Sequence, residues 1–167
     1  MQNELPKRKH PRLDNYDYST AGAYFVTICV RDRLHVFSDI TKIITNSVEY
    51  KTQLTSYGKI AEAQLLSLPK RYPFLTIDRY VIMPDHIHVV FVFDRKAEEQ
   101  QLRPSVTDIV CAYKSLTAKE CKQNGFNGDL FQTSFYEHII RNEQDYSNIV
   151  EYIYDNPKRK YYDEAKK

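Results

Sequence analysis

The sequence has no tryptophan, only four glycines and only three cysteines among its 167 residues. So few glycines argue against a glycine-rich loop that cradles a phosphate group. The cysteines, Cys29, Cys111 and Cys121, are odd in number and lack a Cys-x-x-Cys spacing, which argues against a disulfide framework and a zinc site. The first eleven residues contain no apolar run and do not resemble a secretory signal, so we expect a protein of the reducing cytoplasm.

Tyrosine, by contrast, is abundant: the chain has 14 tyrosines and eight phenylalanines. Hydrophobic residues make up 42% of the chain and charged residues 28%, which predicts one globular domain and neither a membrane-spanning nor a disordered chain. The net charge of +2 is too small to indicate nucleic-acid binding by itself, because that requires a local basic patch.

Basic residues are clustered at two places in the chain. We expect residues 1–20 to form a basic arm, residues 21–157 the domain, and residues 158–167 a basic and polar tail. Such clusters usually serve as solvated tails, but in a protein that acts on nucleic acid they would add salt-dependent affinity for the backbone. The residues concerned are Lys7, Arg8, Lys9 and Arg12 in the arm, and Lys158, Arg159 and Lys160 in the tail.

The hydrophobic periodicity predicts seven elements in the order strand, helix, strand, strand, helix, strand, helix. The strands are expected at residues 24–30, 74–83, 86–93 and 131–141, and the helices at about 56–68, 106–122 and 143–156. Residues 33–53 have weak periodicity and are expected to form an irregular hairpin or an insertion. The first six elements match the split βαβ, or ferredoxin-like, arrangement of the α+β class, an antiparallel sheet with two helices on one face. The last helix is an addition to that arrangement.

Polar residues and prolines predict where the helices begin and end. Caps are expected at Thr55, at Ser105 with Asp108 in a capping box, and at Asn142. We expect Pro69 to end the first helix and Pro157 to end the last one near Asn156, because proline disfavours a helical conformation in the residue before it.

The segment His86-Ile87-His88 begins a predicted strand. Side chains alternate along a strand, so both imidazoles point to one face while Ile87 points into the core. Two neighbouring imidazoles are suited to bind a divalent cation. The alternative is a pair of histidines on a half-solvated sheet face, and the spacing alone leaves both interpretations open.

The last predicted helix carries Tyr152 and Asn156 four residues apart, so the two side chains lie on one side of it. They border its apolar stripe and would lie beside the two histidines if that border packed over them. A surface tyrosine with an asparagine that closes the helix is the alternative.

These residues occur in an ordered combination that resembles a known family. His86-Ile87-His88, preceded by residues 81–85, resembles the HUH motif of the single-tyrosine transposases. The runs at residues 135–142 and 151–157 resemble the branch called REP-associated tyrosine transposases, and the resemblance spans about residues 24–157. Asp85 is a departure, because Asn is frequent before the first histidine of the motif.

The resemblance implies an activity and a set of site residues. His86, His88 and Asn156 would bind Mg²⁺ or Mn²⁺, which would polarise the scissile phosphate of single-stranded DNA that forms hairpins. Tyr152 would attack this phosphate, forming a 5′-phosphotyrosine link and freeing a 3′-hydroxyl for later rejoining. The protein would be cytoplasmic, associated with the nucleoid when acting on DNA, without a membrane partner, and either a monomer or a homodimer.

Other residues have weaker assignments. Tyr154 is the rival nucleophile, but it points about 200° away from Tyr152 around the helix, so only Tyr152 shares a face with Asn156. Lys114 and Ser115 resemble a recurrent family position and would contact phosphate, or else belong to a solvated face. Glu137 and His138 lie in the fourth predicted strand, where His138 would act near the site, contact DNA or make a structural hydrogen bond.

Two other functional hypotheses remain at this stage. A domesticated descendant of the family would bind DNA hairpins without cleaving them, although the intact residue set argues against it. An unrelated ferredoxin-like module that binds metal or oligomerises would have no affinity for such hairpins.

Overall fold

The computed structural model describes residues 21–94 and 104–166. The predicted basic arm, with Lys7, Arg8, Lys9 and Arg12, lies outside these residues. Ten elements follow one another: β1 (Gly22–Cys29), the 3-10 turn η1 (Arg31–Arg33), β2 (Ser38–Ile44), β3 (Val48–Leu54), α1 (Ser56–Arg71), β4 (Leu75–Ile82), β5 (His86–Phe93), α2 (Val106–Gln123), β6 (Tyr136–Ile140) and α3 (Glu143–Glu164). No helix within the described ranges is long and apolar enough to cross a membrane.

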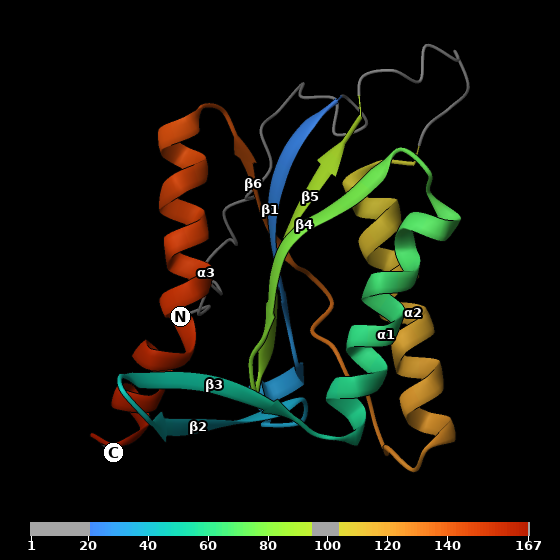
Figure 1. Cartoon of the computed structure of the whole chain (residues 1–167). Helices are drawn as coiled ribbons and strands as arrows, with labels where there is room; N and C mark the ends of the chain where they lie inside the picture. The colour runs from blue at the N-terminus through green and yellow to red at the C-terminus, as the bar shows by residue number, and fades with distance from the viewer. Residues whose placement is uncertain (1–20, 95–103, 167) are drawn as a thin grey trace, which may run out of the picture.

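A four-stranded antiparallel sheet in the order β4-β5-β1-β6 forms the centre of the molecule. Figure 1 shows α1 and α2 on one face of this sheet and α3 on the other. Strands β2 and β3 form a separate hairpin near the C-terminal end of α3. The predicted mixture of helices with an antiparallel sheet is therefore confirmed.

Both faces of the sheet bury apolar side chains, because helices cover both. The larger cluster lies on the α1 and α2 face and includes Tyr24, Val26, Ile28, Ile87, Val89 and Phe91. The smaller cluster lies under α3 and is made of Phe25, Val90, Ile149 and Ile153. Strand β5 is central and covered on both sides, which explains why its apolar residues form a nearly continuous run.

The predicted caps are confirmed. The side chain of Thr55 accepts a hydrogen bond from the Gly58 N–H at 3.0 Å, and α1 begins there. Ser105 and Asp108 form a reciprocal capping box at the start of α2. Asn142 caps α3 by accepting from the Asp145 N–H at 2.8 Å. These caps satisfy backbone donors that a helix leaves unpaired in its first turn.

Two predicted helix ends were wrong, because neither proline stops its helix. α1 continues past Pro69 to Arg71, and α3 continues past Pro157 to Glu164. A proline removes one helical hydrogen bond, but tertiary contacts can outweigh that cost. In α3 such contacts follow directly, since Tyr162 packs on Tyr50 of β3 with a hydroxyl–hydroxyl distance of 2.7 Å. The predicted tail at residues 158–167 is therefore helical as far as Glu164.

Two strand predictions also need correction. Residues 38–54 form a regular antiparallel hairpin rather than an irregular one. The last strand of the main sheet begins at Tyr136, and Phe131 makes only an isolated bridge with Val30. Phe131 packs in the core, so its apolar character reflects burial and not strand pairing.

Candidate active site

The two histidines of β5 face α3. Their ring centroids are 4.5 Å apart, and both side chains are nearly buried. Ile87 between them points into the α1 and α2 side of the core, as the alternation of a strand requires. The structure therefore places both histidines on one face of the sheet, as predicted.

Each imidazole is held at its Nδ1 atom. His88 Nδ1 lies 2.8 Å from the hydroxyl oxygen of Thr27 on β1, and His86 Nδ1 lies 2.7 Å from Oδ1 of Asp85. His88 Nε2 is buried and has no hydrogen-bond partner among the described residues. A buried polar nitrogen is normally satisfied, so this atom is suited to a ligand.

Helix α3 places Tyr152 and Asn156 opposite the histidines. The Tyr152 ring lies edge-on to His88 with centroids 5.2 Å apart, and Asn156 is 7% exposed. Both residues line a cavity of about 690 Å³ together with His86 and His88. The structure thus brings the four predicted residues together, although the histidines lie more than 60 positions before Tyr152 and Asn156 in the sequence.

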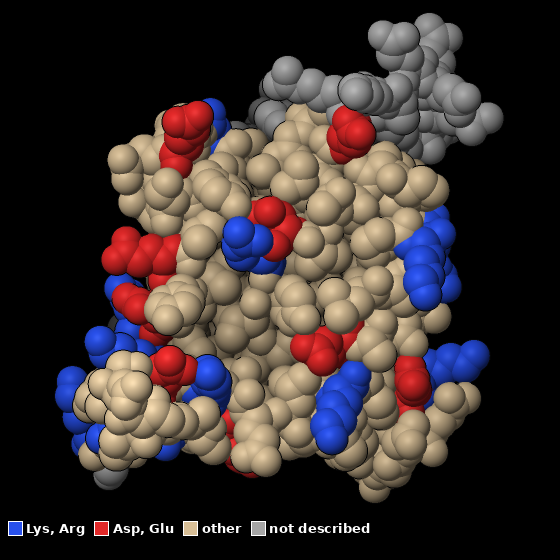
Figure 2. Space-filling model, in the orientation of Figure 1, with Lys and Arg blue, Asp and Glu red and all other residues tan. Residues whose placement is uncertain are grey.

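Tyr154 lies on the other side of α3. Its side chain is 81% exposed, against 38% for Tyr152. It lines a separate groove of about 560 Å³ between α3, β3 and β4. In Figure 2, which shows the side of the molecule drawn in Figure 1, Lys and Arg side chains gather at the lower left, around the C-terminal part of α3 and the β2–β3 hairpin.

The electrostatics of the site keep His88 neutral. Burial, reinforced by electrostatic interactions with His86 and Arg33, lowers the pKa of His88 from 6.5 to about 3, although Asp85 opposes this shift. Burial would raise the pKa of Asp85, but its hydrogen bond and electrostatic interaction with His86 and the charges of Arg33 and Lys160 outweigh it, so that the pKa falls below its usual range. A neutral imidazole with a free Nε2 is the form that binds metals.

The donor set fits a divalent cation. His88 offers a buried nitrogen without a partner, and the Asp85–His86 pair has the carboxylate–histidine arrangement that orients metal-binding imidazoles. Within the described part of the chain, no three His, Cys, Asp or Glu side chains are placed to share an ion. Asn156 lines the same cavity and offers an amide oxygen as a third donor, and nitrogen and oxygen donors without thiolate suit Mg²⁺ or Mn²⁺.

The remaining predicted residues are dispersed. Arg159 lies over the Tyr152 ring, and His138 lines the same cavity while its Nε2 lies 2.9 Å from Oδ2 of Asp145. Lys158 lines the groove of Tyr154 on the other side of α3. Lys114 is on α2, beyond the opposite face of the sheet, and donates to the carbonyl oxygens of Gln132 and Thr133. That these residues contact DNA stays a prediction.

Sequence reasoning missed three residues that shape the cavity, Phe25, Thr27 and Arg33, and named Lys160 only as part of a basic cluster. Phe25 stacks on His88 with centroids 5.2 Å apart, and Thr27 bonds the same ring. Arg33 and Lys160 both approach Asp85. Only Lys160 had a sequence signal, its place in the basic cluster after Pro157. Phe25, Thr27 and Arg33 reach the cavity through strand pairing or a loop conformation, which no local sequence pattern predicts.

The fold and the cavity define a structural class of proteins, in which an antiparallel sheet presents two histidines to a helix that carries a tyrosine. An uncharacterized Haemophilus influenzae protein is 30% identical over 165 residues, covering 90% of this chain and 88% of its own. The REP-associated tyrosine transposase of Escherichia coli K12 is 25% identical over 145 residues, covering 84% and 68%. No family model matches the chain.

A solved structure of a REP-associated tyrosine transposase bound to a REP hairpin has the same fold. Its TM-score is 0.63 at 21% identity, and the match covers 89% of this chain and 73% of that one. The chain is therefore a relative of the REP-associated tyrosine transposases and is similar to them over most of its length.

Proposed function

We propose that this protein is a metal-dependent DNA endonuclease and strand transferase that cleaves and rejoins hairpin-forming single-stranded DNA through Tyr152. The observation that carries the proposal is the meeting of Tyr152, Asn156, His86 and His88 around one cavity. The strand order β4-β5-β1-β6, with α1 and α2 on one face, supports the ferredoxin-like form of the fold. The solved relative bound to a REP hairpin supports hairpin DNA as the partner.

The cation would be held by Nε2 of His86, Nε2 of His88 and the amide oxygen of Asn156. When bound, it supplies a Lewis acid that polarises a non-bridging oxygen of the scissile phosphate and orients it. His88 is neutral over the physiological pH range because of its burial, so no proton has to leave before it binds. Thr27 and Asp85 hold the two rings through their Nδ1 atoms, which leaves Nε2 of each directed to the ligand.

Tyr152 is the nucleophile in this proposal. Its phenolic oxygen forms a bond to phosphorus while the bond from phosphorus to the 3′ oxygen breaks. The phenolic proton passes to solvent and the departing 3′ oxygen takes up a proton, so one phosphate ester replaces another. Rejoining is the reverse attack by a 3′-hydroxyl, which restores the free phenol without an external energy source.

The position of Tyr152 suits this role. The ring is partly exposed and can reach a strand in the cavity, while contacts with Phe25 and His88 limit its orientations. Holding a nucleophile beside the phosphate that it attacks removes much of the entropic part of the barrier.

A covalent capture assay tests the proposal. The full chain is incubated with Mn²⁺ and a labelled single strand that carries a hairpin with its flanking sequence, and adducts are separated on a denaturing gel. We expect an adduct with the native protein and with Tyr154→Phe, and none with Tyr152→Phe. An adduct that survives Tyr152→Phe would overturn the assignment.

The same assay separates the proposal from its alternative. A hairpin shift on a native gel without any adduct, at Mn²⁺ and Mg²⁺ concentrations up to the millimolar range, would indicate a domesticated protein that binds hairpins without cleaving them. Size-exclusion chromatography with light scattering, with and without the hairpin, decides between a monomer and a homodimer.

A further inference from the structure

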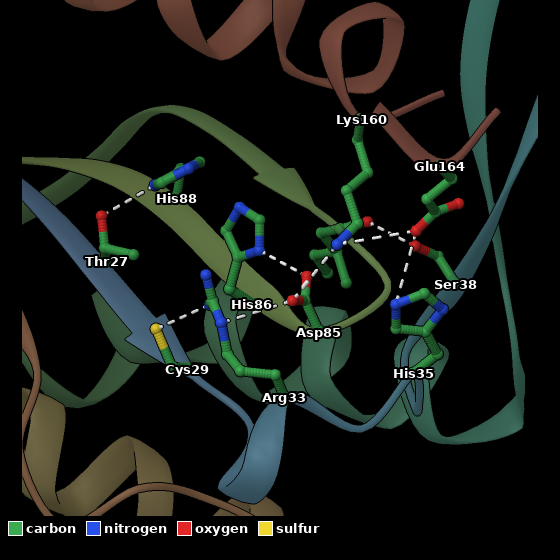
Figure 3. A network of polar contacts seen from close by, with 11 residues as sticks. Thr27, Cys29, Arg33, His35, Ser38, Asp85, His86, His88, Lys160 and Glu164 are labelled. Carbon is green, nitrogen blue, oxygen red and sulfur yellow. Dashed lines mark hydrogen bonds and ion pairs between the residues drawn. The ribbon is translucent and has the colours of Figure 1, made fainter. Parts of the chain in front are cut away.

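The residue before the first histidine is a buried carboxylate with three partners. Asp85 is 3% exposed. Its Oδ1 lies 2.7 Å from His86 Nδ1, and its Oδ2 lies 3.4 Å from both Arg33 Nε and Lys160 Nζ. Figure 3 shows Asp85 between these three side chains.

The three partners come from three separate parts of the chain. His86 begins β5, Arg33 ends η1, and Lys160 lies in the last turns of α3. Lys160 also pairs with Glu164 at 3.5 Å, and Glu164 pairs with His35 at 3.4 Å (Figure 3). A continuous polar network therefore runs from His86 to the C-terminal end of the tyrosine helix.

The turn that supplies Arg33 is strained. Asp32 and Arg33 have φ angles of 54° and 56°, in the left-handed region that non-glycine residues rarely adopt. Such conformations are unfavourable and persist only where the surroundings hold them. Arg33 is held by Asp85 and by Cys29, whose Sγ lies 3.1 Å from Nη1.

A buried carboxylate is stable only when its charge is compensated. His86 satisfies Oδ1, and the side chains of Arg33 and Lys160 satisfy Oδ2. The position of each partner therefore depends on the others through the Asp85 carboxylate. Outer groups of this kind fix the tautomer and the direction of a metal-binding imidazole. A cation that binds His86 would favour the same arrangement of Asp85 that holds Lys160.

We propose that Asp85 is a positioning residue that fixes His86 with Nε2 toward the cation and, through Lys160, links cation binding to the docking of the C-terminal turns of α3. The inference rests on the proposed function only in that a divalent cation binds His86. Coupling of this kind is reciprocal, so docking of the helix end raises the affinity for the cation and the cation strengthens the docking.

Two readouts test this inference without DNA. Calorimetry measures the Mn²⁺ affinity of the full chain, and hydrogen exchange measures protection of residues 158–164 with and without Mn²⁺. The variants are Asp85→Ala, the nearly isosteric Asp85→Asn, and Lys160→Gln. Lys51→Gln is the control, because it also removes a lysine–carboxylate ion pair, 2.8 Å to Glu49, but on the exposed hairpin.

We expect Asp85→Ala to weaken Mn²⁺ binding by about 10- to 100-fold, the usual effect of removing an outer partner of a metal ligand. Asp85→Asn keeps an acceptor for His86 but not the charge, so we expect it to lose less Mn²⁺ affinity than Asp85→Ala. Lys160→Gln weakens binding several-fold although Lys160 contacts neither histidine. Mn²⁺ slows exchange at residues 158–164 in the native chain and in Lys51→Gln, and this response is lost in Asp85→Asn and Lys160→Gln.

The inference is overturned if Asp85→Asn and Lys160→Gln keep both the native affinity and the native exchange response. Tyr152-dependent adducts on the hairpin would then leave the proposed function standing. If the native chain binds no Mn²⁺ at millimolar concentration, the inference and the metal part of the proposed function fail together. Should Asp85→Ala not fold, as judged by circular dichroism, Asp85→Asn and Lys160→Gln still decide the outcome.

Discussion

The guanidinium of Arg159 lies over the ring of Tyr152, with its central carbon 5.6 Å from the ring centroid. The two residues are seven positions apart on α3, so they share a face, and both line the cavity of the histidines. A guanidinium at this place could bind a non-bridging oxygen of the phosphate that Tyr152 would attack under the proposed function.

We therefore predict that Arg159→Ala slows adduct formation roughly 100-fold, the usual effect of losing one charged or hydrogen-bonding group from a reacting phosphate or acyl centre. Arg159→Lys keeps the charge but not the paired donors, so its rate of adduct formation should lie between the rates of the native chain and of Arg159→Ala. The measurement is the single-turnover rate at fixed salt. Lys158→Ala, on the opposite side of α3, should have a clearly smaller effect; equal losses would contradict a role at the phosphate.

Asn156 offers a second prediction, on the affinity for the cation. Its amide is buried at the cavity wall, four residues after Tyr152. We expect Asn156→Ala to weaken Mn²⁺ binding at least about tenfold, because a ligand contributes no less than the groups that orient one. Asn156→Asp, which keeps an oxygen donor, should retain binding. Asn148→Ala removes another amide from the same cavity and should leave the calorimetric affinity unchanged; a matching loss there would contradict the assignment.

The depressed pKa of His88 predicts a pH dependence of stability. Burial, with electrostatic interactions from His86 and Arg33, holds the folded pKa of His88 at about 3, against 6.5 for an unperturbed histidine. Below pH 6.5 the unfolded chain therefore binds a proton at His88 that the folded chain does not bind. The free energy of unfolding should fall as pH drops from about 6.5 toward 3, by at most about 1.4 kcal/mol per pH unit from this group.

Urea denaturation with EDTA at pH 7.0, 6.0, 5.0 and 4.5 measures this dependence. We expect the loss of stability across this range to be smaller in His88→Gln than in the native chain. The depressed pKa of Asp85 does not interfere, because that carboxyl loses stability only below its usual pKa, under pH 4. Parallel curves for the native chain and the variant would refute the prediction.

Gly58 predicts a packing requirement at the start of α1. A Cβ atom at this position would collide with the backbone carbonyl group of Phe37. That carbonyl oxygen also accepts from the Thr55 N–H at 2.9 Å, so it is not free to move away. Gly58→Ala should destabilise the fold by about 2 kcal/mol or more, whereas Lys59→Ala, at the exposed next position, should change it little. Thermal melting of the two variants measures the difference.

The helix starts were predictable because caps are local. Thr55, Ser105 and Asn142 each bond a backbone donor three residues away, so the pattern is contained in a few letters. The helix ends were not predictable, because the effect of a proline is decided by contacts far along the chain. Tyr162, five residues after Pro157, packs on Tyr50, which is 112 positions away from it.

The same distinction applies to the site. His86 with His88, and Tyr152 with Asn156, follow from the periods of a strand and of a helix, so the sequence placed each pair on one face. Which residues hold these pairs could not be predicted. Thr27 is 61 positions from His88 and Lys160 is 75 from Asp85, and only the pairing of strands and the path of α3 bring them together.

The pairing of β1 with β5 sets Thr27 opposite His88 and Cys29 opposite His86. If the two strands slipped by one residue, Thr27 would no longer face His88, and the histidines would be displaced toward the other face of the sheet. Strand β1 supplies no residue of the histidine motif, yet its alignment sets which side chain lies 2.8 Å from Nδ1 of His88. The geometry of the histidine site therefore depends on the register of β1 as well as on the histidine motif, and substitutions that loosen β1 would displace the two imidazoles without changing any residue of the motif.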